Sequence, residues 1–297
     1  MRWGYRRAKN RPAPGRDLIA LLIAAPFAVF GIFYSVTGTW NALSEPIVEE
    51  VKITIPRLPA ELEGLRIVQL TDLHASPLFG KDRMAAITSI ANAQNPDLTL
   101  ITGDFADGTT ERRAPDLAPL KNLTARYGVY GVSGNHEYLD SYPKLKALIE
   151  SLGIRMIDND AVTLDVNDRK VTLLGVTDRS AYRFNLPSSD IEKAVAAASP
   201  DSLRILLDHQ PHNAQKNSSR TYGVDLQLSG HTHGGQLSVF SGPAAAANGG
   251  FVRGFYQVNN MALYVSQGTG LWAGLPLRIG TWPEITVITL TSGKAAQ

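Results

Sequence analysis

Residues 66–74 read RIVQLTDLH, and the fold can be worked out from the pattern they contain. Arg66–Leu70 is a short, mostly apolar run, which predicts a buried β-strand. Asp72 and His74 follow this run directly. Side chains two residues apart on an extended chain point to the same side, so the predicted strand ends by delivering two metal-type ligands to one place.

The same arrangement occurs four more times along the chain. Four further apolar runs predict strands at Leu98–Ile101, Val129–Val132, Leu203–Leu207 and Val224–Leu228. The polar groups that follow them are Gly103-Asp104, Gly134-Asn135-His136-Glu137, His209 and His231-Thr232-His233. Sites in α/β sheets form outside the carboxyl ends of the strands, so we expect all five groups at one edge. Of the six histidines, only His212 lies elsewhere.

Each of these groups, taken alone, also has a purely structural interpretation. Asp-x-His, Gly-Asp and Asn-His are common in turns and hydrogen-bonded caps, and a single histidine such as His209 is often a satisfied polar residue. Five such groups in order after five predicted strands are not explained in that way. We therefore interpret the set as the side chains of one shared site.

Helical patterns separate the predicted strands. Leu145, Leu148, Ile149 and Leu152 are spaced as on one face of a helix, and Gly153 predicts its end. Strands that alternate with helices predict an α/β fold in which both faces of a sheet are covered.

The remaining signals predict a second sheet. Val162–Asp165 and Lys170–Val176 are expected to form a hairpin, and Ser189 with Glu192 matches a capping box. The first and last strands of the body are expected at Val51–Ile55 and Ile285–Leu290. We therefore expect two stacked mixed β-sheets flanked by helices, preceded by one transmembrane helix.

The N-terminal segment differs from the rest of the chain. Leu18–Trp40 contains no charged residue over 23 positions, which is long enough to span a bilayer, and Asp17 is a candidate N-cap. A cleaved signal peptide is the alternative, but its apolar region is shorter and ends in small residues, unlike Trp40. A buried helix of a soluble protein is the third interpretation.

Charge is distributed unevenly around this span. Residues 1–16 contain six basic residues and no acidic one, which leaves residues 17–297 with a net charge of −4 in a chain of net charge +2. The positive-inside rule then predicts a single-pass protein of the inner (cytoplasmic) membrane, with a cytosolic N-terminus and an external, periplasmic body. The body has no basic excess, so no nucleic-acid partner is expected. No protein partner can be inferred.

These observations divide the chain into five parts. They are a basic cytosolic tail at 1–16, an anchor or uncleaved signal at 17–40, a linker at 41–50, the domain that carries the five polar groups at 51–292 and a short tail at 293–297. Hydrophobic residues make up 44% of the chain and charged residues 19%, so the body is globular. The chain has no cysteine, which excludes disulfides and thiolate metal sites.

The five polar groups resemble the motifs of the calcineurin-like metallophosphoesterases in order and spacing over about 165 residues. The stretch Gly230-His-Thr-His-Gly-Gly-Gln236 and the later residues Gly268, Gly270, Arg278 and Glu284 resemble the membrane-linked bacterial phosphodiesterase branch. That similarity runs from about Ile53 to Leu290. It implies a fold of two stacked sheets with two metals at the sheet edge.

The resemblance also assigns roles to particular residues. It implies one metal held by Asp72, His74, Asp104 and His233, and a second held by Asp104, Asn135, His209 and His231. His136 would be the general acid near the leaving group, oriented by Asp107. In some members an arginine follows this aspartate, whereas here Gly108 follows, so the phosphate-clamping arginine of the phosphoprotein phosphatases is not matched.

The chemistry of this ligand set favours particular metals and a particular reaction. Nitrogen and oxygen ligands without sulfur suit Mn, Fe, Zn or Co better than Ca or Mg. Two such ions ~3.5–4 Å apart neutralise phosphate oxygens and supply hydroxide as the nucleophile. We therefore expect a metal-dependent hydrolase of phosphoesters, most simply a phosphodiesterase that acts on a lipid-linked or other membrane-linked substrate.

Other functions remain open at this stage. Some relatives hydrolyse the pyrophosphate of a UDP-linked acyl-glucosamine, which is cytosolic chemistry and conflicts with an external body. A phosphomonoesterase and a non-catalytic metal-binding scaffold are two further alternatives. The apolar stretch 237–255, which includes Ala244–Ala247, is interpreted as a loop that either packs on the core or touches lipid or substrate.

Overall fold

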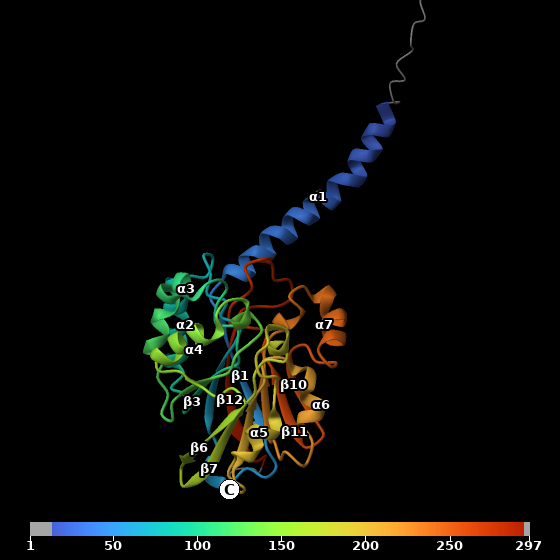
Figure 1. The fold of residues 1–297 in the computed structure, drawn as a ribbon. Coiled ribbons are helices and arrows are strands. Elements are labelled where there is room, and N and C mark those ends of the chain that lie inside the picture. The colour runs from blue at the N-terminus through green and yellow to red at the C-terminus, as the bar shows by residue number, and fades with distance from the viewer. Residues whose placement is uncertain (1–13, 294–297) are drawn as a thin grey trace, which may run out of the picture.

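Two six-stranded β-sheets stack face to face in this chain (Figure 1). The computed structural model describes residues 14–293, so most of the predicted basic tail and residues 294–297 lie outside the described residues. The first sheet has the order β1 (Ile47–Thr54), β12 (Glu284–Thr291), β2 (Arg66–Leu70), β3 (Leu98–Ile101), β4 (Val129–Gly131) and β5 (Arg155–Met156). The second has the order β10 (Gly254–Val258), β11 (Met261–Val265), β9 (Leu226–Ser229), β8 (Leu203–Leu207), β7 (Arg169–Gly175) and β6 (Asp160–Val166).

Helices cover the outer faces of both sheets. The helices are α1 (Pro14–Leu43), α2 (Lys81–Ala93), α3 (Thr110–Leu117), α4 (Tyr142–Ser151), α5 (Ile191–Ala196), α6 (Ala214–Asn217) and α7 (Ser241–Ala247). Short 3-10 turns lie at Ala60–Leu62, Ala118–Asn122, His136–Leu139, Ala181–Phe184, Pro211–Asn213, His233–Gly235 and Ser238–Phe240. Residues of α2, α3 and α4 pack on one outer face, and residues of α5 and α6 pack on the other. The predicted fold class, two mixed sheets flanked by helices, is confirmed.

The core between the sheets explains why the strands are apolar on both sides. In β2, Ile67 faces the second sheet, whereas Val68 and Leu70 face the helices. Gln69 is a buried polar exception on the inner face. Its Nε2 donates to Ser229 O of β9 at 2.9 Å and to Thr102 Oγ1 at 3.1 Å, which connects the two sheets just below the strand ends.

Strand direction places the polar groups and the N-terminal helix at the same edge. β2, β3 and β4 are parallel to one another, as are β7, β8, β9 and β11. In the first sheet Ile47 pairs with Glu284, and Thr286 pairs with Gln69. The carboxyl end of β2 therefore lies beside the amino ends of β1 and β12, where α1 joins the body.

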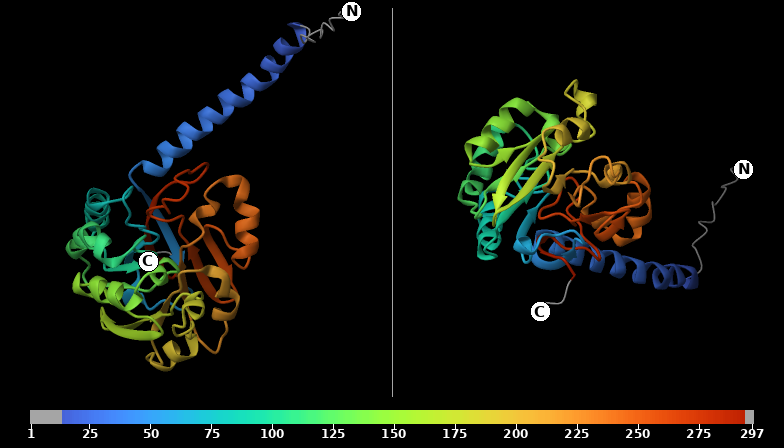
Figure 2. Two further views of the ribbon diagram at one scale, coloured as in Figure 1. Left: turned by 45° about the horizontal axis from the view of Figure 1, so that its top comes forward. Right: turned by 90° about the horizontal axis from the view of Figure 1, so that it is seen from below.

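Helix α1 extends from the body as a long, exposed helix (Figures 1 and 2). Its stretch Leu18–Leu43 is apolar enough to cross a membrane, and most of it is exposed, although Ala42 near its end is buried against the body. The helix starts before Asp17, so that residue is not its N-cap, and it continues past Trp40 to Leu43. The connection to β1 is only Ser44–Pro46 rather than all of 41–50, because β1 pairs with β12 along its whole length.

Two local predictions were wrong. The side chain that caps α5 is Asp190, whose carboxylate accepts a hydrogen bond from Lys193 N at 2.9 Å, and Ser189 has no capping role. Ala244–Ala247 is part of helix α7 rather than a loop. Alanine has the highest intrinsic helix propensity, so four consecutive alanines favour a helix over a loop.

Leu100 lies in the middle of β3, fully buried between the two sheets. Leu100→Ala is expected to lower the free energy of unfolding by about 2–5 kcal/mol, because it leaves a cavity that the rigid sandwich cannot close. The fall in Tm, roughly 2–4 °C per kcal/mol, is measured on the full chain in detergent. Leu139→Ala, at a largely exposed leucine, is the matched control and should change Tm little. Equal shifts in Tm for both variants would contradict the buried position of Leu100 between the sheets.

Candidate metal centre

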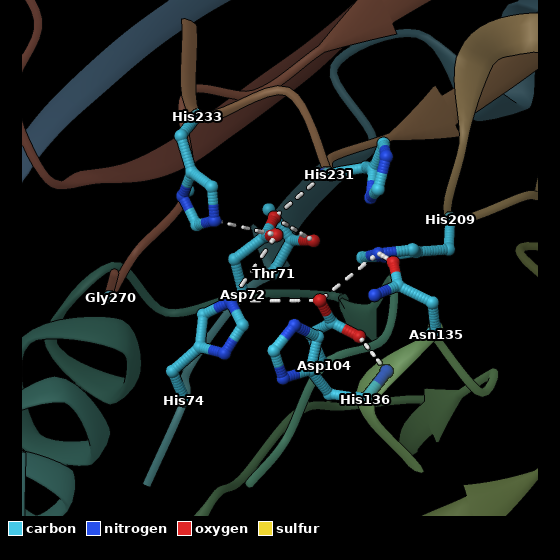
Figure 3. Close-up of polar contacts among 12 residues, drawn as sticks. Thr71, Asp72, His74, Asp104, Asn135, His136, His209, His231, His233 and Gly270 are labelled. Atoms are coloured by element: carbon cyan, nitrogen blue, oxygen red, sulfur yellow. Dashed lines mark hydrogen bonds and ion pairs between the residues drawn. The ribbon is translucent and has the colours of Figure 1, made fainter. Parts of the chain in front are cut away.

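Polar side chains from both sheets converge at the shared edge (Figure 3). Asp72 and His74 follow β2, Asp104 follows β3, and His209 follows β8. The other members, Asn135 after β4 and His231 with His233 after β9, complete the set. The convergence of side chains from strands that are far apart in sequence is what the parallel arrangement predicts. Every candidate ligand identified from the sequence lies in this cluster.

The first group of possible ligands is Asp72, His74 and His233. Their ligand atoms lie within 4.8 Å of one another. Asp72 Oδ1 is 3.5 Å from His233 Nε2 and 3.8 Å from His74 Nε2, and both Asp72 and His74 are fully buried. The two imidazole Nε2 atoms and the carboxylate oxygen thus face a common point.

The second group is Asp104, His209 and His231, with the same close spacing. Asp104 Oδ2 is 3.3 Å from His209 Nε2, and Asn135 Oδ1 is 3.2 Å from the same nitrogen. Asp104 Oδ2 is also 3.6 Å from His74 Nε2 of the first group. One carboxylate oxygen therefore faces both groups.

Asp107 joins a third group with His74 and His136. Its Oδ1 lies 2.9 Å from His74 Nδ1 and 2.6 Å from His136 Nδ1. A hydrogen bond at Nδ1 fixes the ring and its tautomer and leaves Nε2 free. His209 is oriented in the same way, because its Nδ1 lies 2.6 Å from Thr102 O.

The backbone at these residues differs from the extended chain expected from the sequence. Asp72, His74, Asp104, His231 and His233 all have φ between 45° and 68°. Non-glycine residues rarely adopt this left-handed region, and strain of this kind persists only where surrounding contacts fix the backbone. On an extended chain His231 and His233 would point to the same side. Here His231 belongs to the second group and His233 to the first.

Hydrogen bonds between the loops hold this strained backbone. Asp72 N donates to Gly103 O and His74 N donates to Asp104 O, both at 3.0 Å. Gly270 N donates to Asp72 O at 2.9 Å. Asp72 Oδ2 accepts from Thr71 Oγ1 at 2.9 Å and from His231 N at 3.0 Å, which leaves Oδ1 directed at the first group.

The electrostatics favour a cation at the centre. Burial opposes the charged form of Asp72 and Asp104, but the histidines around them outweigh it and hold both carboxyl pKa values below their usual range. Burial likewise opposes charge on His74, yet its hydrogen bond to Asp107 and the nearby carboxylate of Asp72 raise its pKa to about 10. Buried ionised carboxylates need a positive partner, which is either a protonated imidazole or a metal ion.

Two of the histidines, His231 and His233, lie in surroundings that favour the neutral imidazole. Burial lowers the pKa of His233 to about 3, and burial together with the charge of His209 lowers the pKa of His231. A neutral imidazole has the free lone pair that a metal requires. The first and second groups therefore each combine a carboxylate whose charged form is favoured with an imidazole whose neutral form is favoured.

Unpaired buried atoms provide the test of whether a metal fits. Asp72 Oδ1 and His74 Nε2 are buried and have no hydrogen-bond partner among the described residues. A buried polar atom without a partner lowers the stability of the fold unless a hydrogen bond or a bound ion satisfies it. Both atoms belong to the first group, and the donor set contains only nitrogen and oxygen. These residues fit a divalent transition metal.

One important residue had no role in the prediction from sequence. Glu137 is fully buried and accepts from three backbone N–H groups, Asp104 at 2.8 Å, Phe105 at 2.7 Å and Gly134 at 2.6 Å. Burial and the charge of Asp104 raise the pKa of Glu137 to about 7. Its side chain ties the loop after β3 to the loop after β4. The only hint in the sequence was that Glu137 directly follows His136 in one of the five polar groups.

Comparison with known proteins agrees with this geometry. The family model for calcineurin-like phosphoesterase matches residues 65–235. A Helicobacter pylori protein named uncharacterized metallophosphoesterase is 33% identical over 264 residues, covering 89% of this chain and 68% of that protein. The chain therefore belongs to the calcineurin-like phosphoesterase family, and the predicted family is confirmed.

Relatives occur in animals as well as bacteria. A Danio rerio protein named transmembrane protein with metallophosphoesterase domain is 35% identical over 295 residues, covering 96% of this chain and 65% of that protein. The Bacillus subtilis protein named uncharacterized metallophosphoesterase YkuE is 33% identical over 264 residues, covering 86% of this chain and 90% of its own. The chain spans just under two thirds of the Danio rerio relative. The apolar helix and the relative's name support membrane association.

Gly230 permits the close approach of β9 to the first group. A Cβ at this position would overlap Thr71 Oγ1 and Asp72 Oδ2, so Gly230→Ala must displace the Asp72 carboxylate. We expect the variant to fold but to bind less metal than the unaltered protein, measured by elemental analysis after dialysis.

Gly242→Ala is the matched control, because a Cβ at Gly242 meets nothing within 4 Å. Its metal content should equal that of the unaltered protein. Full metal content in Gly230→Ala would show that metal binding does not depend on the observed position of the Asp72 carboxylate.

Proposed function

We propose that this chain is a hydrolase of phosphoesters, most specifically phosphodiesters, that uses two divalent metal ions. The observation that carries the proposal is the position of Asp104 Oδ2, 3.3 Å from His209 Nε2 and 3.6 Å from His74 Nε2. A carboxylate oxygen that faces two ligand groups is the arrangement needed to bridge two neighbouring ions. Family membership supports the same class of reaction.

The two groups suggest how the ligands divide between the ions. Asp72, His74, Asp104 and His233 would hold one ion, and Asn135, His209 and His231, again with Asp104, would hold the other. The close spacing of each group and the unpaired Asp72 Oδ1 support this division. Mn, Fe, Zn and Co all suit such nitrogen and oxygen ligands.

The roles of the other residues follow from where their free atoms point. When bound, a pair of such ions neutralises phosphate oxygens and lowers the pKa of water. His136 donates from its backbone N to Asp104 Oδ1 at 2.9 Å, and its ring is held at Nδ1 by Asp107. Nε2 is therefore available to give a proton to the leaving oxygen, with Asp107 as the positioning residue.

The charge around the site favours diesters over monoesters. Among residues 14–293, no arginine or lysine forms an ion pair with Asp72, Asp104 or Asp107. Gly108 occupies the position after Asp107 where some members have an arginine. A monoester dianion carries one more charge than a diester and gains more from such a cationic clamp. Arg278, which lies near the first group, donates to the backbone carbonyls of Gly268 and Gly270 and is thereby held in the loop between β11 and β12. A site without a free cationic clamp of this kind suits the diester.

Metal-stripped protein should be inactive and should recover activity when Mn is added. With metal restored, we expect bis(p-nitrophenyl) phosphate to be hydrolysed with a higher kcat/KM than p-nitrophenyl phosphate, because the diester needs no additional cation. Rates are followed by the absorbance of p-nitrophenolate. A faster monoester would overturn the substrate class. Inactivity with each of Mn, Fe, Zn and Co would overturn the reaction and favour a metal-binding scaffold.

His136→Ala should retain both metals and lose turnover by a factor of roughly 10²–10⁴, the usual contribution of a general acid. The loss should grow as the leaving group becomes more basic, because a good leaving group needs no proton. The measurements are metal content and kcat across aryl and alkyl diesters.

His212→Ala removes a histidine outside the metal centre and is the control, with unchanged rates expected. A loss of metal from His136→Ala would instead identify His136 as a ligand. A uniform loss across all leaving groups would rule out its role as the acid.

We also propose that the N-terminus is cytosolic and the body external, because six basic residues and no acidic ones precede the span. The absence of native cysteine allows a direct test. In intact cells a membrane-impermeant maleimide should label Lys170→Cys, in an exposed hairpin of the body, and should label Lys9→Cys only after permeabilisation. The reverse pattern would place the body in the cytosol, where a UDP-linked pyrophosphate substrate becomes the better candidate.

A further inference from the structure

The last turns of α1 are fixed to the body instead of forming a free tether. Gly38 O accepts a hydrogen bond from Arg278 N at 2.9 Å, and Asn41 Nδ2 donates to Arg278 O at 3.2 Å. Arg83 Nη1 donates to Leu43 O at the end of the helix, at 3.2 Å. The direction of α1 therefore determines which face of the body is turned toward whatever surrounds the helix.

Arg278 links this docking to the metal centre. Its guanidinium is fully buried and donates to Gly268 O at 3.2 Å, Gly270 O at 2.7 Å and Trp282 O at 3.2 Å. Gly270 in turn bonds to Asp72 O. The loop between β11 and β12 thus contacts α1 on one side and the first ligand group on the other, as Figures 1 and 3 show.

The length of α1 places this loop at the boundary of a bilayer. A hydrocarbon core of ~30 Å takes about 20 helical residues. Counted from Leu18, the first residue of the candidate span, this length ends near Thr37. Gly38, which bonds to the loop, is the next residue. Any tilt of the helix would move Gly38 deeper.

Exposed apolar side chains gather on the segments at this level. We call them the rim, and they are Trp40, Val239, Phe240, Trp272, Leu275 and Trp282. Hydrogen bonds connect their segments, since Gln236 Nε2 donates to Leu275 O and Ser238 N donates to Ile279 O at 3.0 Å. The rim includes Trp40 of α1 itself, and the loop that carries Trp272, Leu275 and Trp282 bonds to α1 through Arg278.

We propose that the rim lies in the interfacial layer of the same bilayer that α1 spans. Three of its six members are tryptophans, which favour the boundary between water and acyl chains because the ring is apolar and its N–H is polar. Large apolar side chains in contact with water are costly, and the bilayer removes that cost without a further partner. The metal centre, at the same edge of the sheets, then opens close to the membrane surface.

A second copy of this chain is the other occupant to consider for the rim. The bilayer is favoured because α1 leads directly into the rim and is fixed to it by hydrogen bonds. A partner chain would have to cover the rim beside a helix that is itself surrounded by lipid. This proposal concerns where the body sits and does not depend on which reaction it catalyses.

The test uses the full chain in phospholipid vesicles and takes advantage of its lack of cysteine. Val239→Cys and Leu275→Cys each receive one NBD fluorophore, with Lys170→Cys as the control. Val239 is 81% exposed, so its replacement disturbs no packing. Lys170 is in β7, whose amino end lies at the opposite edge of the sheets. Fluorescence is compared in vesicles of ordinary phosphatidylcholine and of phosphatidylcholine brominated on its acyl chains.

Brominated lipid should quench the labels at 239 and 275 and leave the label at 170 unchanged. Equal emission in both lipids at 239 and 275 would overturn the proposal. If that result came with energy transfer between labels of neighbouring chains, the rim would be an interface between copies. Quenching at 170 as strong as at the rim would also overturn it, because the body would then have no defined orientation. Two rim positions ensure that a folding defect in one variant leaves the other informative.

Discussion

The site depends on one buried carboxylate, Asp104, held between two sets of imidazoles. Its side chain is almost fully buried, and its Oδ2 faces both His74 and His209. Burial alone would favour the neutral acid, so the surrounding histidines are what keep it ionised. A charge of this kind is stable only with a cation beside it, and the same requirement makes the position suitable for metal ions.

The rest of the structure can be understood as what holds Asp104 and its partners in place. Parallel strands in both sheets deliver the ligands to one edge, and Gln69 connects the sheets just beneath it. Glu137 ties the loops after β3 and β4 together through three backbone N–H groups. These contacts fix the left-handed backbone at the ligands, which would be unstable in a freely moving loop.

Much of this arrangement could be predicted from the sequence, for reasons that differ between its parts. Strands such as β3 and β8 were placed at their observed bounds because buried parallel strands are continuous apolar runs. The candidate ligands could be identified because they follow these strands. The direction of each side chain was not predictable, because it depends on positive φ values at residues such as His231. The roles of Glu137 and Arg278 also depend on backbone groups distant in sequence, which no local pattern reveals.

The most direct test of the central claim is electron paramagnetic resonance of the full chain after titration with Mn²⁺. A carboxylate shared by two ligand groups predicts two ions per chain that are magnetically coupled. Asp104→Asn should weaken that coupling. The spectrum predicted for the unaltered protein at saturation is that of an exchange-coupled pair. A single bound ion, or two ions with the independent six-line spectra of isolated Mn²⁺, would contradict the account.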